Sequence, residues 1–291
     1  MKKLTVGKVT INILFVLMSI CFLLPFFIIL MISISKEADV LNWGYRIIPM
    51  HIDFTAYKAL FSNWQQVLTA ILISLFSTVG GTTLLVIVNA MMAYPLSQPA
   101  FRKRGLIMAV VIFTMIFSAG VMPSYIINTR WLHLGNNLLI YILPGLANAW
   151  TIILFRTFFM QIPPSLIEAA AIDGATEFQI LKSVIIPQSK AIVGMVFVNN
   201  AIAKWNDWTT PLYYITDKRL YNIQYLMQKI LNEASFLKQQ YLENPQFGQN
   251  DIPVETLRFA MCVIAVVPIL LFFPFAQKYF AKGVSVGSVK E

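Results

Sequence analysis

Five consecutive residues, Lys204-Trp205-Asn206-Asp207-Trp208, bring a cation, an amide, an anion and two indoles into an apolar part of the sequence. If that part is helical, a rise of about 1.5 Å per residue puts them roughly 20–27 Å from its inner end, in the outer half of a membrane. Ionisable groups at such a depth are costly and usually functional. Because indole faces stack on sugar rings and Asn and Asp bond hydroxyl groups, the four residues from Trp205 to Trp208 predict the lining of a substrate path.

Plainer interpretations of this cluster stay open. Lys204 and Asp207 lie three residues apart, so they are able to pair on one helix face. Trp205 and Trp208 fit an aromatic belt where a helix leaves the membrane. A further alternative uses Lys204 and Asp207 as the ion-coupling pair of a stand-alone secondary transporter.

The sequence offers no catalytic or metal-binding constellation. Its two histidines, His51 and His133, fall near predicted outer loops, and neither His-Glu-x-x-His nor Gly-x-Ser-x-Gly occurs. Cys21 and Cys262 lie in apolar stretches, where they behave as small hydrophobes. The chain has no Gly-x4-Gly-Lys-Ser/Thr loop for ATP. We therefore expect no enzyme activity, no catalytic residue, no metal and no cofactor.

The elements that position these residues are predicted to be membrane helices. The chain has 291 residues, of which 58% are hydrophobic and 12% charged, a balance unlike that of a soluble domain. Six stretches are about 20 residues or longer and apolar enough to cross a hydrocarbon layer of roughly 30 Å. They cover residues 9–35, 67–96, 105–127, 138–160, 191–215 and 257–280. The expected fold class is an all-α integral membrane protein with six transmembrane helices.

Lys and Arg orient these spans. The predicted inner segments concentrate basic residues with few acids, whereas the outer segments carry a nearly equal number of both. The inner basic residues are Lys2, Lys3, Lys8, Arg102, Lys103, Arg104, Arg156, Lys182, Lys190, Lys278, Lys282 and Lys290. Both termini are therefore predicted to be cytoplasmic. The net charge of +9 is then mostly a topology signal, and it does not predict nucleic-acid binding.

The second predicted span carries a stripe of small and polar residues at three- and four-residue spacing. The stripe consists of Ser74, Ser77, Thr78, Gly81, Thr82 and Asn89. Stripes of this kind pack helix against helix. A hydrated pathway is the functional alternative, and the sequence leaves both open.

The segment of residues 161–190, called here the 161–190 loop, predicts two short water-facing helices. Ser165 is the predicted N-cap of the first, with Glu168 three residues on at a capping-box spacing. The helix should end at Asp173-Gly174, because glycine readily takes the left-handed conformation that closes a helix.

Thr176 should start the second helix of the 161–190 loop, and Pro187 should end it. On the first helix, Ala169 and Ala170 are predicted to face water and to leave a low, smooth surface. Another protein could approach such a surface closely. The loop therefore predicts a docking element.

The spacing of this loop resembles the EAA loop of importer permeases in ATP-binding-cassette systems. That loop reads Glu-Ala-Ala, three residues, Gly, nine residues and Ile-x-Leu-Pro. The matching residues here are Glu168, Ala169, Ala170, Gly174, Val184, Ile186 and Pro187. Other segments are similar to carbohydrate-uptake permeases of the maltose type. They are Ala93-Tyr94-Pro95-Leu96-Ser97, Phe101-Arg102-Lys103-Arg104-Gly105, Trp205-Asn206-Asp207 and the tail that ends in Gly287-Ser288-Val289-Lys290.

The resemblance implies the inner-membrane permease half of a binding-protein-dependent sugar importer, with an oligosaccharide as the expected cargo. Its implied partners are a second permease, two ATPase subunits that bind the ATP, an extracytoplasmic sugar-binding protein and membrane lipid. The residues implied to couple to the ATPases are Glu168, Ala169, Ala170, Asp173, Gly174 and Pro187. The tail is implied to contact the ATPases as well, through turns at Gly283 and Gly287.

The predicted organisation is a single transmembrane permease domain over residues 1–291. Five core spans occupy about 67–280, with a cytoplasmic coupling loop at 161–190 and an outer loop at 216–256. Residues 221–240 of the outer loop are expected to be helical. A cytoplasmic tail covers 281–291.

Overall fold

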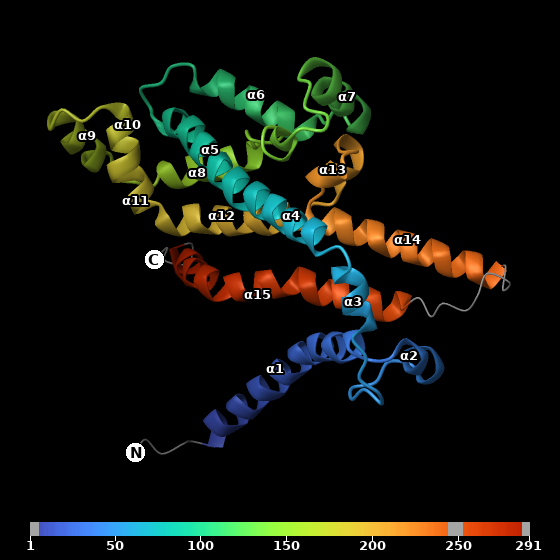
Figure 1. The fold of residues 1–291 in the computed structure, drawn as a ribbon. Coiled ribbons are helices and arrows are strands. Elements are labelled where there is room, and N and C mark those ends of the chain that lie inside the picture. Colours follow the sequence, from blue (N-terminus) through green and yellow to red (C-terminus); the bar gives the residue numbers. More distant parts are fainter. Residues whose placement is uncertain (1–5, 244–252, 287–291) are drawn as a thin grey trace. The chain divides into compact units, whose positions relative to one another are not determined.

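The computed structural model describes residues 6–243 and 253–286, and these residues form helices and connecting loops (Figure 1). Within the described residues, β structure is limited to an isolated bridge between Ser35 and Ile52. The predicted all-helical fold class is confirmed. The chain divides into two compact units, residues 1–67 with 226–268 and residues 68–225 with 269–291, and each is described by itself.

The first unit combines long helices with two short ones. Its elements are α1 (Val6–Ser33), α2 (Glu37–Trp43), α3 (Thr55–Phe61), the start of α4 (Trp64–Leu75), most of α14 (Ile223–Glu243) and the first half of α15 (Val254–Val286). Helix α14 confirms the helix expected over residues 221–240.

Glu37, the first residue of α2, caps the first turn of α15. Its carboxylate accepts the backbone N–H groups of Glu255 at 3.0 Å and Thr256 at 2.9 Å, and the Thr256 hydroxyl at 2.8 Å. Lys238 of α14 lies 3.7 Å from the same carboxylate. A helix N-terminus leaves N–H groups unpaired and favours negative charge, so one buried side chain satisfies both needs.

The second unit is built around α5, which packs on α8 and α12. Its first elements are η1 (Phe76–Gly80), α5 (Gly81–Ser97), α6 (Arg104–Ile116), α7 (Val121–Ile126), η2 (Ile127–Trp131), η3 (Leu138–Tyr141) and α8 (Ala149–Phe159). The later ones are α9 (Pro164–Ile172), α10 (Glu177–Ile180), η4 (Leu181–Ile185), α11 (Ile186–Gln188), α12 (Lys190–Trp205), α13 (Thr209–Tyr214) and η5 (Lys218–Leu220). The helical segments η1, η2 and η4 are π-helical.

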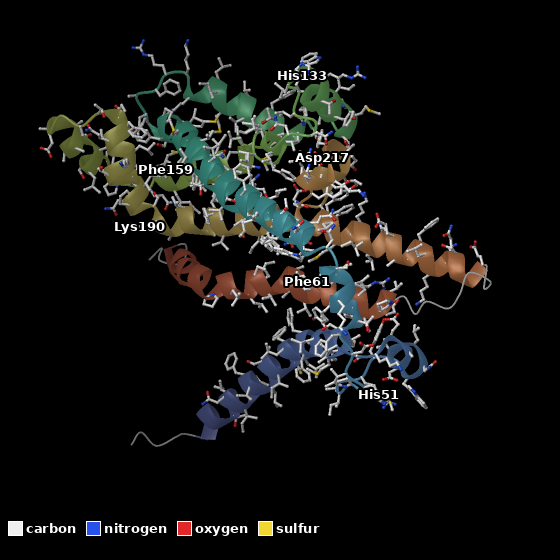
Figure 2. The ribbon with its side chains drawn as sticks, viewed as in Figure 1. His51, Phe61, His133, Phe159, Lys190 and Asp217 are labelled. Carbon is white, nitrogen blue, oxygen red and sulfur yellow. The ribbon has the colours of Figure 1, made fainter. Side chains whose placement is uncertain are left out.

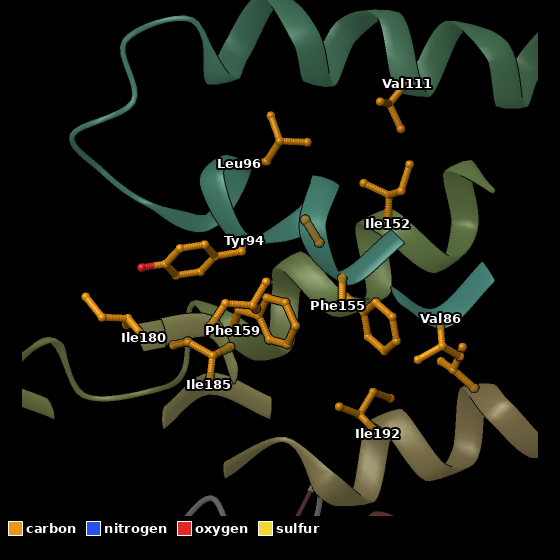
Figure 3. Close-up of a cluster of buried hydrophobic side chains, with 14 residues drawn as sticks. Val86, Tyr94, Leu96, Val111, Ile152, Phe155, Phe159, Ile180, Ile185 and Ile192 are labelled. Carbon is orange, nitrogen blue, oxygen red and sulfur yellow. The ribbon is translucent and has the colours of Figure 1, made fainter. Parts of the chain in front are cut away.

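The apolar core of this unit joins α5, α8, α12 and the 161–190 loop (Figure 3). Phe155 and Phe159 of α8 are almost completely buried, and their rings stack with centroids 5.6 Å apart. Ile180 and Ile185 reach the same cluster from the loop. The loop is therefore anchored to the helices through its buried side.

Within residues 6–243 and 253–286, three helices are long and apolar enough to cross a membrane, and up to six spans result if each of three bent pairs is one span. The straight helices are Thr10–Ser33, Trp64–Ser97 and Val254–Leu271. The bends are 111° between Ile116 and Val121, 82° between Phe159 and Pro164, and 85° between Gln188 and Lys190.

The expectation of continuous helices over 105–127, 138–160 and 191–215 is wrong. The first breaks before Gly120, whose φ of +80° does not continue a helix. The second begins only at Ala149, with Asn148 as its N-cap. The third ends at Trp205. Hydrophobicity located these segments, but local backbone chemistry interrupts them.

Candidate functional site

Helix α9 is the first helix of the 161–190 loop, and it begins at two prolines. Pro163 occupies the N-cap position and Pro164 the first turn. The prediction of Ser165 as N-cap is wrong, because the fixed φ of Pro164 and its missing N–H suit the first helical position and start the helix earlier. Glu168 is exposed on α9.

The alanines of α9 differ in their surroundings. Ala169 is exposed, as predicted, whereas Ala170 is half-buried against the apolar core. The prediction that both face water is therefore wrong for Ala170. Part of the alanine face of α9 therefore packs against the core of the same chain.

Gly174 closes α9 in the left-handed conformation, with φ of +80°. Asp173 is the C-cap. The N–H of Gly174 donates to Ala171 O at 3.0 Å, and the N–H of Ala175 donates to Ala170 O at 3.0 Å. The predicted turn is confirmed.

Thr176 is the N-cap of α10, as predicted, and its capping-box partner is Gln179. The Thr176 N–H donates to the Gln179 side chain at 2.7 Å, and the Gln179 N–H donates back to the Thr176 hydroxyl. Gln179 was not predicted as this partner, although the Thr-x-x-Gln spacing is typical of a capping box.

Pro187 does not end the second helical stretch of the loop. It lies inside α11, and the chain turns only at Ser189, which caps α11. The prediction is wrong by two residues, because proline in the first turn of a helical segment needs no N–H partner.

One side of the loop is anchored and the other is open. Ile180 and Ile185 are buried in the core, whereas Ile172 is 86% exposed and Phe178 is 60% exposed. The 161–190 loop lies at the end of the second unit marked by Phe159 and Lys190, away from the end marked by His133 and Asp217 (Figure 2). Large apolar side chains are thus presented at one end of this unit.

The cluster of residues 204–208 lies where α12 ends. Trp205 is buried, while Trp208 is 44% exposed, so the two indoles do not share one environment. Lys204 donates from Nζ to Tyr141 O at 2.8 Å. Among the described residues, no ion pair joins Lys204 to Asp207.

Asp207 instead holds the start of α13. One carboxylate oxygen accepts the N–H of Thr209 at 3.1 Å, its hydroxyl at 3.0 Å, and the N–H of Thr210 at 3.0 Å. The backbone carbonyl of Asp207 accepts a short hydrogen bond from the Asn222 side chain. These contacts hold the chain in a turn and explain why the predicted span is interrupted here.

A cavity of about 400 Å³ opens beside this break. Its walls combine amide, hydroxyl, indole and charged groups. It is lined by Leu85, Gly145, Asn148, Asn200, Ala203, Lys204, Asn206, Asp207, Trp208 and Thr209. Three predicted path residues lie in this wall, and Trp205 is not among the lining residues. Two further lining residues were not predicted: Asn148, the N-cap of α8, and Asn200, one turn before Lys204 on α12.

Gly81 leaves room for the Lys204 side chain. A Cβ at this position would lie 3.0 Å from Lys204 Cε and 3.2 Å from its Nζ. Because Nζ is held by Tyr141 O, the side chain is not free to move aside. The small residue in the stripe therefore allows α5 and α12 to approach with a lysine between them.

We expect Gly81→Ala to displace Lys204 and to lower the stability of the purified protein by about 1–3 kcal/mol, the usual effect of overpacking. Thermal unfolding of detergent-purified protein measures this. The matched control is Gly80→Ala, where the nearest atom is 4.0 Å away and alanine favours the helix. Equal melting temperatures for the two variants would contradict the role of Gly81.

The predicted tail site is only partly within the described residues. Helix α15 continues to Val286, so the turn predicted at Gly283 is wrong, and Gly283 lies inside the helix. Gly287 lies outside the described residues. The tail thus contributes no geometry to the candidate site.

Comparison with known proteins gives similar chains over nearly the whole length. The chain is 35% identical to Protein LplC of Bacillus subtilis, over 92% of this chain and 89% of that protein. It is 33% identical to the polygalacturonan/rhamnogalacturonan transport system permease protein YtcP of the same organism, over 92% of both chains. A chain in the crystal structure of a bacterial ABC transporter involved in the import of the acidic polysaccharide alginate matches with a TM-score of 0.78 and 29% identity, over 94% of this chain and 96% of that chain.

The family model for binding-protein-dependent transport system inner membrane components matches residues 90–286. Members are ABC transporter permeases of the bacterial cell membrane, and ATP hydrolysis takes place in separate subunits. The apolar helices of the structure agree with a multi-pass membrane protein. The chain therefore belongs to the binding-protein-dependent transport system inner membrane components, as a permease and not as an enzyme.

Proposed function

We propose that the chain is one permease subunit of an ATP-driven importer that carries an oligosaccharide. It forms the translocation pathway with a second permease, and it works with two ATPase subunits and an extracytoplasmic sugar-binding protein. The relatives support the cargo, because their names include transport of arabinooligosaccharides, of polygalacturonan and of alginate.

The observation that carries the proposal is the construction of the 161–190 loop. Two short helices meet at Gly174 in a left-handed turn, with their inner side chains in the core and Ile172 and Phe178 in the open. Exposed apolar side chains beside a rigid turn are typical of a protein docking surface. We propose that the ATPase subunits dock here and that the loop follows their movement.

The proposed topology has six spans with both termini in the cytoplasm. The three straight helices and the three bent pairs can supply six crossings. The concentration of Lys and Arg in the predicted inner segments supports the orientation. In this topology the 161–190 loop faces the ATPases.

The cavity at the end of α12 is the proposed part of the sugar path in this subunit. Asn148 and Asn206 offer amide donors and acceptors, and Trp208 offers a partly exposed indole face. This chemistry binds sugar hydroxyls and ring faces without demanding one particular sugar. Modest affinity suits a path, because tight binding would slow release.

Copurification tests the proposal against a stand-alone secondary transporter. The chain is expressed with a second permease and ATPase subunits from the same cells, and the purified complex is assayed for ATP hydrolysis stimulated by the sugar-loaded binding protein. We expect a complex with stimulated hydrolysis. A chain that purifies alone and drives uptake from an ion gradient would overturn the proposal. The structure already weakens that alternative, because Lys204 bonds Tyr141 O instead of Asp207.

Asp207 substitutions separate transport chemistry from folding. Asp207→Asn keeps an oxygen that can accept the N–H groups of Thr209 and Thr210, so we expect folded protein with reduced uptake. Asp207→Ala removes this cap at a cost of about 0.5–2 kcal/mol and should lower both yield and uptake. Expression level, proteoliposome uptake and sugar affinity of the binding protein are measured in parallel. Normal uptake by Asp207→Asn would remove the carboxylate from the proposed path.

Deletion of residues 283–291 tests the proposed tail contact. We expect the shortened chain to insert and to be purified in normal yield, because the deletion begins beyond the predicted last span. ATP-driven uptake should fall, since the proposed contact to the ATPase pair is lost. Unchanged hydrolysis stimulated by the binding protein would argue against any role of the tail.

A further inference from the structure

A single side-chain bond links the end of α5 to the start of α10. Tyr94 donates its hydroxyl proton to Glu177 at 2.6 Å. Tyr94 is buried at the edge of the apolar core (Figure 3), whereas Glu177 is exposed as the first residue of α10. A hydrogen bond to a carboxylate of this length is about twice as strong as one between neutral groups.

Tyr94 belongs to α5, and hydrogen bonds hold α5 and α8 together as a rigid pair of helices. Asn89, fully buried in α5, donates to Leu146 O at 2.8 Å and accepts the Asn148 N–H at 2.8 Å. Arg156 of α8 donates from Nε to Leu96 O at 2.9 Å. These bonds hold α5 and the beginning and end of α8 together, so the two helices should move as one body.

The 161–190 loop meets this body at Glu177 through a hydrogen bond beside open space. Beside the bond lies a groove of about 470 Å³. It is lined by Met91, Tyr94, Pro95, Gln98, Ala100, Phe101, Glu177, Phe178 and Leu181. Among the described residues, no other side-chain hydrogen bond joins α5 to the loop. Packing of Ile180 in the core holds the far end of α10, whereas the hydrogen bond of Glu177 holds its first residue to α5 beside the open groove.

We propose that Tyr94 is a positioning residue that, through the Glu177 carboxylate, transmits displacement of the 161–190 loop to α5. This inference rests on the proposed docking of ATPases to the loop. A hydrogen bond is directional and short-ranged, so it carries a movement only while both atoms stay in contact. Without the hydroxyl, the loop can still dock and its core contacts remain, but the first residue of α10 loses its direct link to α5.

The test uses the complete transporter in proteoliposomes, with sugar uptake and ATP hydrolysis measured together. Tyr94→Phe removes only the hydroxyl, and we expect the amount of sugar moved per ATP hydrolysed to fall about fivefold or more. Glu177→Ala should show a similar fall, and the double variant should be no worse than either single variant, because both remove one contact. Glu177→Gln keeps an oxygen that accepts the hydroxyl and should stay close to the unchanged protein.

Two further measurements keep the outcomes distinct. Tyr213→Phe, on α13, controls for the loss of a tyrosine hydroxyl elsewhere in the same unit and should leave coupling unchanged. Copurification of the ATPases with the unchanged chain tests the proposed function itself, independently of Tyr94. Unchanged coupling in Tyr94→Phe, additive effects in the double variant, or loss of ATPase copurification in Tyr94→Phe would each overturn the transmitting role.

Discussion

Gly174→Val is expected to leave the protein in the membrane but to abolish most ATP-driven uptake. A β-branched residue in the left-handed conformation costs about 1–2 kcal/mol, so the two helices of the 161–190 loop would lose their fixed angle. If this strain lowers the free energy of ATPase binding by the same amount, the affinity for the ATPases falls roughly 5- to 30-fold. Membrane yield, ATPase copurification and uptake are measured together.

The strain at Gly174 is conformational and not steric, because a Cβ there would meet nothing within 4 Å. Gly174→Asn should therefore retain much of the activity, since Asn tolerates this backbone conformation. Gly44→Val places a β-branched residue at another open glycine of positive φ, +74°, outside the loop. If Gly44→Val loses the ATPases as fully as Gly174→Val does, or if Gly174→Val keeps them, the docking assignment is wrong.

Glu37→Ala is expected to give the largest loss of stability among single substitutions considered for this chain. It removes the acceptor of three hydrogen bonds at the start of α15 and strands those donors. Loss of buried bonds to a charged group should lower the free energy of unfolding by about 2–4 kcal/mol. Thermal unfolding and gel filtration of detergent-purified protein report it.

Glu255→Ala is the matched control for that experiment. It removes a carboxylate from the same helix end, but this carboxylate makes more exposed contacts, with Arg258 at 3.6 Å and Tyr45 at 3.2 Å. Such contacts contribute about 0–1 kcal/mol. A Glu255→Ala protein as unstable as Glu37→Ala would show that the capping bonds are not what stabilises α15.

The features that sequence predicted well are those set by adjacent residues. The left-handed turn at Gly174 and the N-cap at Thr176 depend on chemistry within a few positions, and both are where they were expected. The prediction of Ser165 as the N-cap of α9 also used adjacent residues, but it was wrong because Pro163 and Pro164 start the helix earlier. Capping preferences therefore predict a helix end only where a single residue satisfies them.

The interruptions of the apolar segments escaped prediction because hydropathy does not report the local caps and turns that cause them, and at the end of α12 contacts from distant residues add to the local ones. Lys204 bonds the carbonyl of Tyr141, 63 positions earlier, and Asn222 bonds the carbonyl of Asp207. The three-residue spacing of Lys204 and Asp207, taken alone, had favoured an ion pair between them. The cavity wall was incomplete for the same reason, since Asn148 reaches it from the start of another helix.

The cap made by Glu37 also sets an order for biogenesis. Its partners Glu255 and Thr256 lie 218 and 219 positions later in the chain. At about 5–20 residues per second, the ribosome needs roughly 10–45 s to reach them after Glu37 has been synthesised. During that interval the first unit is incomplete, so α15 completes a unit that α1 and α2 began.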